Sequence, residues 1–309
     1  MRLEPAAFSA LAAGGPSAYR IAADWLLERG DPRGEFILDE LALAERPNPS
    51  TRRAILARRA RRSRDLFRQW EVALRALGVT ECSYRWGFVE RVRLPEKALK
   101  DLPKLLELEP ITKLEVVLSD GVMLAEAMRS SSFAQIRELE LTGRREPVLS
   151  VPAPQIESLA LPVPRQTVDK VCELFPGLKR LHVNGGTNGS AAIDALTSGK
   201  LVVQELWANH TSVSSASVVA LARSDRPVQS LAIGFNGLNR NALRALGASQ
   251  TLAALRELDL RSWDTQSAGF LSTGLPALKH VRVTRPTIED RKLYARRGIS
   301  LDCSGGARD

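Results

Sequence analysis

The stretch VQSLAIGFNGLNRNALRALGAS, residues 228 to 249, decides the fold class of this chain. It begins with a short apolar run in which Leu231 and Ile233 alternate with other residues, so both point to one side of a strand. Its second half, NRNALRALGAS, has the apolar spacing of a helix. The stretch therefore predicts a strand, a turn and a helix that returns the chain.

The strand pattern of this stretch recurs along most of the chain. It consists of an apolar residue, two variable residues, an apolar residue, one variable residue and a last apolar residue. Successive instances are 20 to 27 residues apart, and this regularity indicates an internal repeat. The nine instances are VERVRL (89–94), ITKLEV (111–116), IRELEL (136–141), IESLAL (156–161), LKRLHV (178–183), VQELWA (203–208), VQSLAI (228–233), LRELDL (255–260) and LKHVRV (278–283).

A single strand of this kind cannot bury its apolar side, but strands stacked in parallel bury a continuous core. Helical periodicity lies between several of the strands, in AAIDALTSG (191–199) and SASVVALARS (215–224) as well as in 239–249. The proline-rich segment LSVPAPQIESLALPVPRQ (149–166) predicts an extended or irregular return instead. The sequence thus predicts an α/β solenoid built on a parallel sheet.

The repeat resembles the leucine-rich-repeat family, and its helical returns are similar to those of the ribonuclease-inhibitor-like branch. Asn236 occupies the position of the family's turn asparagine, which bonds to neighbouring backbone, whereas other repeats carry Gly186 or Thr211 there. The resemblance covers about residues 88 to 285 and implies a horseshoe with a parallel concave sheet. A short helix ending at Gly298 and an edge strand near residues 299–301 are expected to close the far end.

The region before the repeats is predicted to be helical. In ADWLLERGDPRGEFILDELAL (22–42), one helix stops at Gly30, and Asp31 with Pro32 starts the next helix at once. A third helix is expected to begin at a cap formed by Ser50 or Thr51. Its predicted apolar stripe consists of Leu56, Ala60, Ser63, Phe67, Trp70 and Leu74.

This helical region resembles the repeat-companion domain, a small module that precedes leucine-rich repeats in many bacterial proteins. The similarity covers roughly residues 5 to 95, and the core DWLLERGDPRGEF is quite specific. The expected organisation is an all-α N-capping module over residues 1–87, followed by a leucine-rich-repeat solenoid with a C-terminal cap over residues 88–309.

The net charge of +9 is concentrated in the third predicted helix. Residues 51–70 contain eight arginines and one aspartate, a charge of +7, which leaves +2 for the rest of the chain. The arginines either pair with acids of the preceding hairpin or contact an anionic partner. No aromatic residue interleaves them for base stacking, because Phe67 and Trp70 belong to the apolar stripe. The candidate basic patch comprises Arg52, Arg53, Arg58, Arg59, Arg61, Arg62, Arg64 and Arg68.

No pattern typical of catalysis or of a bound cofactor occurs in the sequence. The three histidines, His182, His210 and His280, lack a third ligand at metal-binding spacing. A nucleophile elbow and a phosphate loop are also absent. We therefore expect a protein that is not an enzyme and that uses no cofactor, metal or small-molecule substrate.

The setting of the protein is predicted from its apolar runs and cysteines. Neither a signal-peptide pattern nor an apolar run long enough to span a membrane (about 18 residues) occurs. The three cysteines are an odd number without paired spacing, which argues against a disulfide framework. These features predict a cytoplasmic protein without a membrane span.

The variable positions of the strands form the predicted binding face. Their charges are mixed and form no basic track, which favours a protein partner over nucleic acid. Trp207 is the candidate anchor of this face, unless a neighbouring loop covers it. The candidate partner-binding residues are Arg180, His182, Glu205, Trp207, Asn209, Asp259 and Arg261.

The sequence therefore predicts a non-catalytic scaffold or adaptor that binds a protein partner on the concave sheet. One alternative is an adaptor that binds nucleic acid or another acidic partner through residues 52–68. A second alternative is an enzyme inhibitor of the ribonuclease-inhibitor type.

Overall fold

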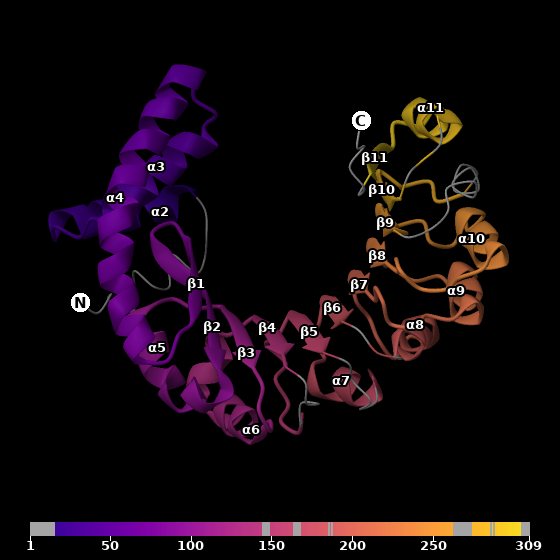
Figure 1. Cartoon of the computed structure of the whole chain (residues 1–309), viewed down its shortest axis with the longest axis horizontal. Coiled ribbons are helices and arrows are strands. Elements are labelled where there is room, and N and C mark those ends of the chain that lie inside the picture. Colours follow the sequence, from indigo (N-terminus) through magenta and orange to yellow (C-terminus); the bar gives the residue numbers. More distant parts are fainter. Residues whose placement is uncertain are drawn as a thin grey trace. The chain divides into compact units, whose positions relative to one another are not determined.

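A computed structural model gives the architecture of the chain as α/β, with helices alternating with mostly parallel strands (Figure 1). The chain forms two compact units. The first unit extends to Val117 and includes Arg129–Ile136, and the second comprises Leu118–Met128 and the chain from Arg137 onward. The described residues are 16–143, 149–162, 168–184, 186, 188–261, 274–284, 286 and 288–303.

The first unit combines a helical region with three strands. Strand β1 pairs antiparallel with β2, and β2 pairs in parallel with β3. The elements are α2 (Pro16–Glu28), α3 (Arg33–Ala44), α4 (Pro49–Ala76), β1 (Glu81–Arg85), β2 (Phe88–Pro95), η1 (Glu96–Asp101), α5 (Leu102–Leu108), β3 (Lys113–Val117) and η2 (Ser131–Gln135).

The predicted stop and restart between the first two helices are confirmed. Gly30 has a φ of 70°, a conformation that glycine adopts without a steric cost, and it follows the last turn of α2. The Asp31 carboxylate then accepts a hydrogen bond of 2.9 Å from the Arg33 N–H, which satisfies a free donor at the start of α3. Because the turn is so short, α2 and α3 form a tight hairpin.

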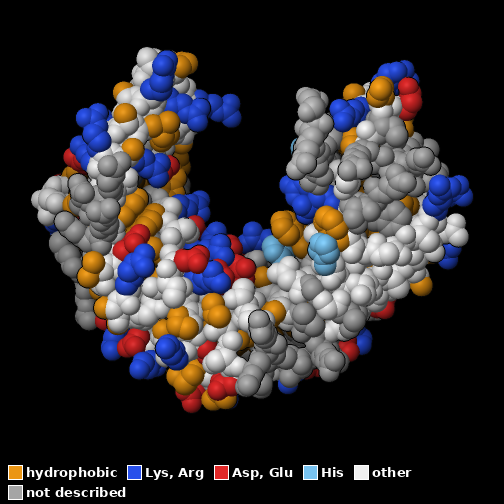
Figure 2. All heavy atoms as spheres, viewed as in Figure 1, with side chains coloured by type: hydrophobic (Ala, Val, Ile, Leu, Met, Phe, Trp, Pro, Cys, Tyr) orange, Lys and Arg blue, Asp and Glu red, His pale blue; other side chains and the backbone are white. Residues whose placement is uncertain are grey.

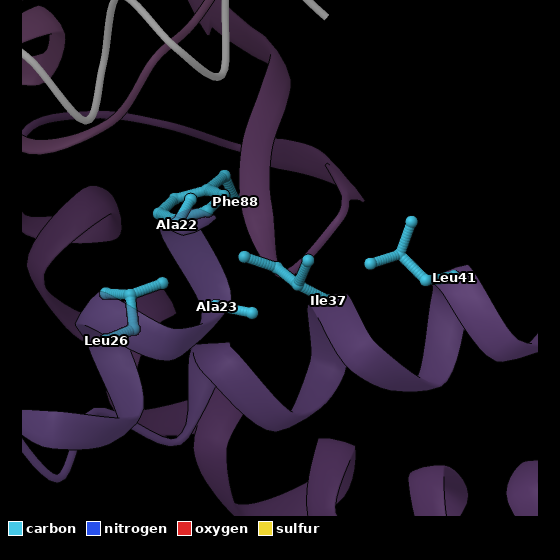
Figure 3. Packing of buried hydrophobic residues seen from close by; sticks show 6 residues of the cluster. All are labelled: Ala22, Ala23, Leu26, Ile37, Leu41 and Phe88. Carbon is cyan, nitrogen blue, oxygen red and sulfur yellow. The ribbon is translucent and has the colours of Figure 1, made fainter. Parts of the chain in front are cut away.

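The hairpin encloses a small apolar core (Figure 3). Gly34 allows the two helices to approach, because a Cβ at this position would lie 2.6 Å from the Ala23 carbonyl oxygen and 2.7 Å from the Leu27 Cγ. Residues from both helices and from β2 then pack together. The six buried residues of this core are Ala22, Ala23, Leu26, Ile37, Leu41 and Phe88.

A buried ion pair connects α3 to the strands of the same unit. The Arg33 guanidinium donates to the Glu109 carboxylate at 2.7 Å, and both side chains are almost completely buried. The other Glu109 oxygen accepts the Val89 N–H at 3.1 Å. Burial raises the pKa of Glu109, and the Arg33 charge and the Val89 N–H oppose that shift. Arg33, one of the charged residues of the hairpin formed by α2 and α3, thus helps to hold α3 against β2.

Two details predicted for the third helix are wrong. The cap of α4 is Asn48, whose side chain accepts the Thr51 N–H at 2.9 Å, and not Ser50 or Thr51. The N-terminal part of the apolar stripe is also misplaced, because Leu56 is 44% exposed whereas Ile55 is buried. The C-terminal part of the stripe is confirmed at the buried Leu74 and at Phe67, whose ring stacks on Tyr84 with 4.1 Å between centroids.

The second unit contains strands in chain order, and all of its described strand pairs are parallel. Figure 1 shows helices α7 to α10 on one side of these strands. The elements are α6 (Val122–Arg129), which begins in this unit, β4 (Glu138–Thr142), β5 (Ser158–Pro162), α7 (Val168–Leu174), β6 (Arg180–Asn184), α8 (Gly189–Ser198), β7 (Glu205–Trp207), α9 (Ser215–Ala222), β8 (Ser230–Ala232), α10 (Arg240–Gly247), β9 (Glu257–Asp259), β10 (His280–Val283), α11 (Ile288–Arg296) and β11 (Ser300–Cys303).

The strand register matches the repeat that the sequence predicts. The fourth position of each repeat is paired with the fourth position of the next, and these residues are buried with at most 2% of their surface exposed. The paired residues are Leu159, Leu181, Leu206, Leu231, Leu258 and Val281. Because side chains alternate along a strand, the residues on either side of each leucine point away from this core.

Two further expectations for the second unit are confirmed. Residues 149–162 of the proline-rich segment contain no helix, and its residues 163–166 lie outside the described part of the structure. At the far end, α11 is followed by Gly298, whose φ is 67°, and by the edge strand β11. In the described part of the chain, no helix combines the length and the apolar character that crossing a membrane requires.

Candidate binding site

The second unit presents two rows of side chains on the face opposite the buried leucines, which we call the open face. Each row crosses six parallel strands, β6 to β11, at one residue per strand. The first row is Arg180, Glu205, Ser230, Glu257, His280 and Ser300. The second row is His182, Trp207, Ala232, Asp259, Arg282 and Asp302.

A hollow of about 460 Å³ lies on the open face across β7 to β11. Its floor at β8 is formed by Ser230 and Ala232, the smallest neighbouring pair among the strands that line it. Trp207 lines it on the β7 side, and Glu257 lines it on the β9 side. The short side chains of β8 therefore leave space between Trp207 and Glu257.

Among the described residues, Trp207 is stacked on one side and open on the other. Its ring lies parallel to the His182 ring, with 4.3 Å between centroids and 2° between planes. In the described part of the structure the residue keeps 36% of its surface exposed. Figure 2 shows pale-blue histidine and orange hydrophobic side chains gathered on this part of the molecule. An exposed indole held by a stacked neighbour is a rigid apolar contact surface.

The environment of His182 favours its neutral form. Burial lowers the pKa of His182 below the ordinary value of 6.5, and the nearby Arg180 charge lowers it further, while Glu138 acts in the opposite direction. Its buried Nε2 has no hydrogen-bond partner among the described residues. The imidazole therefore acts as a flat, uncharged support for the indole.

Asp259 and Arg261 lie close together and form an ion pair with each other. Both Asp259 oxygens lie 3.0 Å from the Arg261 Nε, and one oxygen also lies 2.7 Å from an Arg261 terminal nitrogen. Asp259 keeps only 5% of its surface exposed. The pair neutralises its own charge, so the Asp259 carboxylate is not available as an independent ligand.

The other candidate residues differ in the ion pairs and hydrogen bonds that they form. Arg180 pairs with Glu138 at 2.9 Å. Asn209 lies beyond β7, with a buried Oδ1 that has no hydrogen-bond partner among the described residues. Within the described ranges, no ion pair involves Glu205 or Glu257, although one Glu257 oxygen lies 3.4 Å from the Ser230 hydroxyl.

Several residues of this face were not selected from the sequence. Glu257, Ser230 and Ala232 belong to the repeat positions that the sequence identifies as variable, and comparing side-chain sizes across paired strands could have found the hollow. The second stacked pair, His210 on Phe235 with 4.1 Å between centroids, has no sequence signal. Both residues have left-handed φ values of 56° and 57°, which sequence patterns seldom predict outside glycine and asparagine.

A comparison of the chain with models of protein families finds no match. A comparison with curated proteins finds none either.

The basic patch of α4 is partly neutralised within the first unit. Ion pairs join Arg58 to Asp39, Arg59 to Glu40 and Arg62 to Glu35. The hydrogen bond and charge of Asp39 raise the pKa of Arg58.

The remaining arginines of the patch fall into two groups. Arg52, Arg53 and Arg61 are exposed, and no ion pair within the described residues involves them. The side chains of Arg64 and Arg68 lie outside the described part of the structure. The patch therefore retains an exposed basic surface at Arg52, Arg53 and Arg61.

The strands of the first unit carry a network of ion pairs. Arg91 and Arg93 both bind the Glu115 carboxylate, at 2.6 and 3.1 Å, and Arg93 also binds Glu81 at 2.7 Å. Figure 2 shows the alternating basic and acidic side chains of the first unit. Charges that satisfy one another in this way offer less to a partner than the carboxylates of the open face.

Proposed function

We propose that this chain is a non-catalytic binding protein that holds a protein partner on the open face of its second unit. The observation that carries the proposal is an exposed, stacked Trp207 beside a hollow whose Glu257 carboxylate forms no ion pair in the described structure. Tryptophans in such positions commonly contribute 2 kcal/mol or more (roughly) to binding a protein partner. The absence of catalytic activity and the cytoplasmic setting remain parts of this proposal.

We further propose that the architecture is a leucine-rich-repeat solenoid of the ribonuclease-inhibitor-like type, preceded by a repeat-companion domain. The register of the buried leucines supports the first part. Asn236 also supports it, because its buried side chain bonds to backbone of its own repeat and of the preceding one. In such a solenoid the open face would be the concave sheet, whose curvature offers an extended binding surface.

Affinity capture from native lysate tests this function. The open-face variant combines Trp207→Ala with Glu257→Lys, because replacing the buried Asp259 would instead disturb its pair with Arg261. The matched control combines Val202→Ala with Asp194→Lys, which makes the same kinds of change at exposed positions outside the two rows. We expect the open-face variant to lose specific partners that the wild type and the control retain. Equal capture by all three proteins would contradict the proposal.

A second candidate function rests on the exposed arginines of α4. Arg52, Arg53 and Arg61 would contact phosphates of a nucleic acid or another acidic partner. Such binding would weaken steeply with salt and would be lost in a variant with all three changed to Gln. A titration of duplex and single-stranded nucleic acid at several salt concentrations separates this candidate from the first. An inhibitor of the ribonuclease-inhibitor type would be a special case of the first function, with an enzyme as the partner.

A further inference from the structure

We propose that the hollow of the open face accepts an arginine side chain from the protein partner. The guanidinium would stack on the free face of Trp207, above Ala232, and pair with the Glu257 carboxylate. This inference rests on the proposed function and specifies the chemistry of the partner.

The stacking position follows from the ring geometry. One face of the Trp207 indole is covered by His182, which lies on the neighbouring strand β6. Because the two rings are parallel, the opposite indole face points toward β8, on the other side of β7. The rings are 4.3 Å apart, close to the spacing of about 4.8 Å between adjacent strands. A third flat group in the same stack would therefore lie directly over β8.

Among the described residues, the side chains of β8 leave that third position empty. Ala232 carries only a methyl group at the position paired with Trp207, and Ser230 carries only a short hydroxyl at the position paired with Glu205. Both residues line the hollow. The hollow as a whole, about 460 Å³ across β7 to β11, has room for a flat side chain together with some of the partner's backbone.

The charges around the hollow select a cation for this position. Asp259 is neutralised by Arg261, and Arg282 lies 3.4 Å from Asp302. Glu257, in contrast, forms no ion pair within the described structure. Glu205, one of the two carboxylates that flank Ser230 in the first row, also forms none there. A neutral aromatic group would cover the indole but would leave these carboxylates without a counter-charge.

Arginine matches both requirements better than lysine does. A guanidinium is planar, so it can stack on an indole, and its nitrogens can donate two parallel hydrogen bonds to one carboxylate. A lysine ammonium is a compact point charge that supplies the charge without the stacking. The neutral state of His182 also favours this arrangement, because the ring stacked on the other face of Trp207 then carries no positive charge.

Short capped peptides test the inference directly. The probes are acetyl-Gly-Arg-Gly-amide, its lysine counterpart, and a counterpart with citrulline, which has nearly the shape of arginine but no charge. Binding is followed through the indole N–H resonance of Trp207, which is assigned with a Trp207→Phe variant. We expect the arginine peptide to bind with a Kd in the millimolar range and the citrulline peptide at least tenfold more weakly, with lysine between them.

Three variants locate the binding position. Glu257→Gln should weaken the arginine peptide about tenfold, since a charge-assisted bond is replaced by a neutral one. Ala232→Leu should block binding by filling the third stacking position. Glu173→Gln, a matched change on an exposed part of α7, should leave the affinity within about twofold of wild type. Near-native circular dichroism and urea unfolding of each variant would show that it remains folded.

The possible outcomes separate this inference from the proposed function. Equal binding of the arginine and citrulline peptides, or no binding of either, would overturn the arginine inference. If lysate capture still depended on Trp207 and Glu257 in that case, the open face would remain the binding site for a partner of other chemistry. Arginine-selective binding together with unchanged lysate capture would instead contradict the proposed function.

Discussion

At the residue scale, Asn236 carries more buried hydrogen bonds than its size suggests. Its side-chain oxygen accepts the N–H groups of Thr211 and Val213, each at 3.0 Å. Its amide nitrogen donates to the carbonyl oxygens of Ala208 and Ile233 at 2.8 and 2.9 Å. One side chain therefore satisfies the turns of two successive repeats.

Replacing Asn236 should consequently be costly. Asn236→Ala leaves several buried backbone groups without partners, and we expect the free energy of unfolding to fall by roughly 2–4 kcal/mol. Urea unfolding measures this change. The control is Asn239→Ala, which removes only the cap of α10, a bond of 3.0 Å to the Ala242 N–H, and should cost about 1 kcal/mol. Equal losses in the two variants would refute this account of Asn236.

His182 gives the molecule a pH-dependent stability at the same scale. Its pKa is lowered in the folded chain by burial and by Arg180, with Glu138 opposing, whereas the unfolded chain keeps the ordinary value of 6.5. The unfolded chain therefore binds the proton more readily, and the contribution of His182 is complete above pH 6.5 and is lost as the pH falls below it.

We expect the wild type to lose stability through His182 as the pH falls from 7 to 5. Urea unfolding at both pH values should show a smaller loss for His182→Gln, which cannot titrate. His280→Gln changes an exposed histidine of the same face and serves as the control. If His182→Gln showed the same pH dependence as wild type, the imidazole would not be the responsible group.

At the element scale, the hairpin of α2 and α3 depends on the absence of a side chain at Gly34. Gly34→Ala would place a Cβ 2.6 Å from the Ala23 carbonyl oxygen, a backbone atom that cannot move independently. The helices would have to separate, and we expect a loss of about 2 kcal/mol or more in urea unfolding. Gly237→Ala is the matched control, because no atom lies within 4 Å of the added Cβ, and its effect should stay within about 0.5 kcal/mol. Similar effects of both changes would argue against close packing as the role of Gly34.

The elements also show which features the sequence could predict. The register of β5 to β10 was predictable because the buried leucines repeat in a pattern that only parallel stacking can bury. The start of the α4 stripe was not, because apolar spacing ignores the acids of α3, which draw Arg58 and Arg62 to the facing side instead of Leu56.

The candidate site was predictable only in part, for a similar reason. Strand alternation was sufficient to place Trp207 and His182 in one row of the open face. It could not show that Asp259 is neutralised by Arg261, since that depends on how the two side chains turn toward each other. Nor could it show the hollow, because its volume depends on side-chain sizes compared across paired strands.

At the scale of the whole molecule, the basic patch of α4 and the hollow belong to different units of the chain. No residue of α4 lines the hollow. Changing Arg52, Arg53 and Arg61 to Gln lowers the net charge to about +6 and should weaken retention on a cation-exchange resin. The affinity of the arginine peptide should meanwhile stay within about twofold of wild type. A larger change in that affinity would mean that the two surfaces are coupled.

The strands of the second unit stay in register although the repeat length varies from 20 to 27 residues. The return segments between the strands therefore account for the differences in repeat length. The strands themselves keep a constant register. An engineer could use this property by inserting an epitope tag or a fluorescent reporter at an exposed return, for example beside Asp225. One residue added inside a strand would instead turn the open-face side chains toward the core.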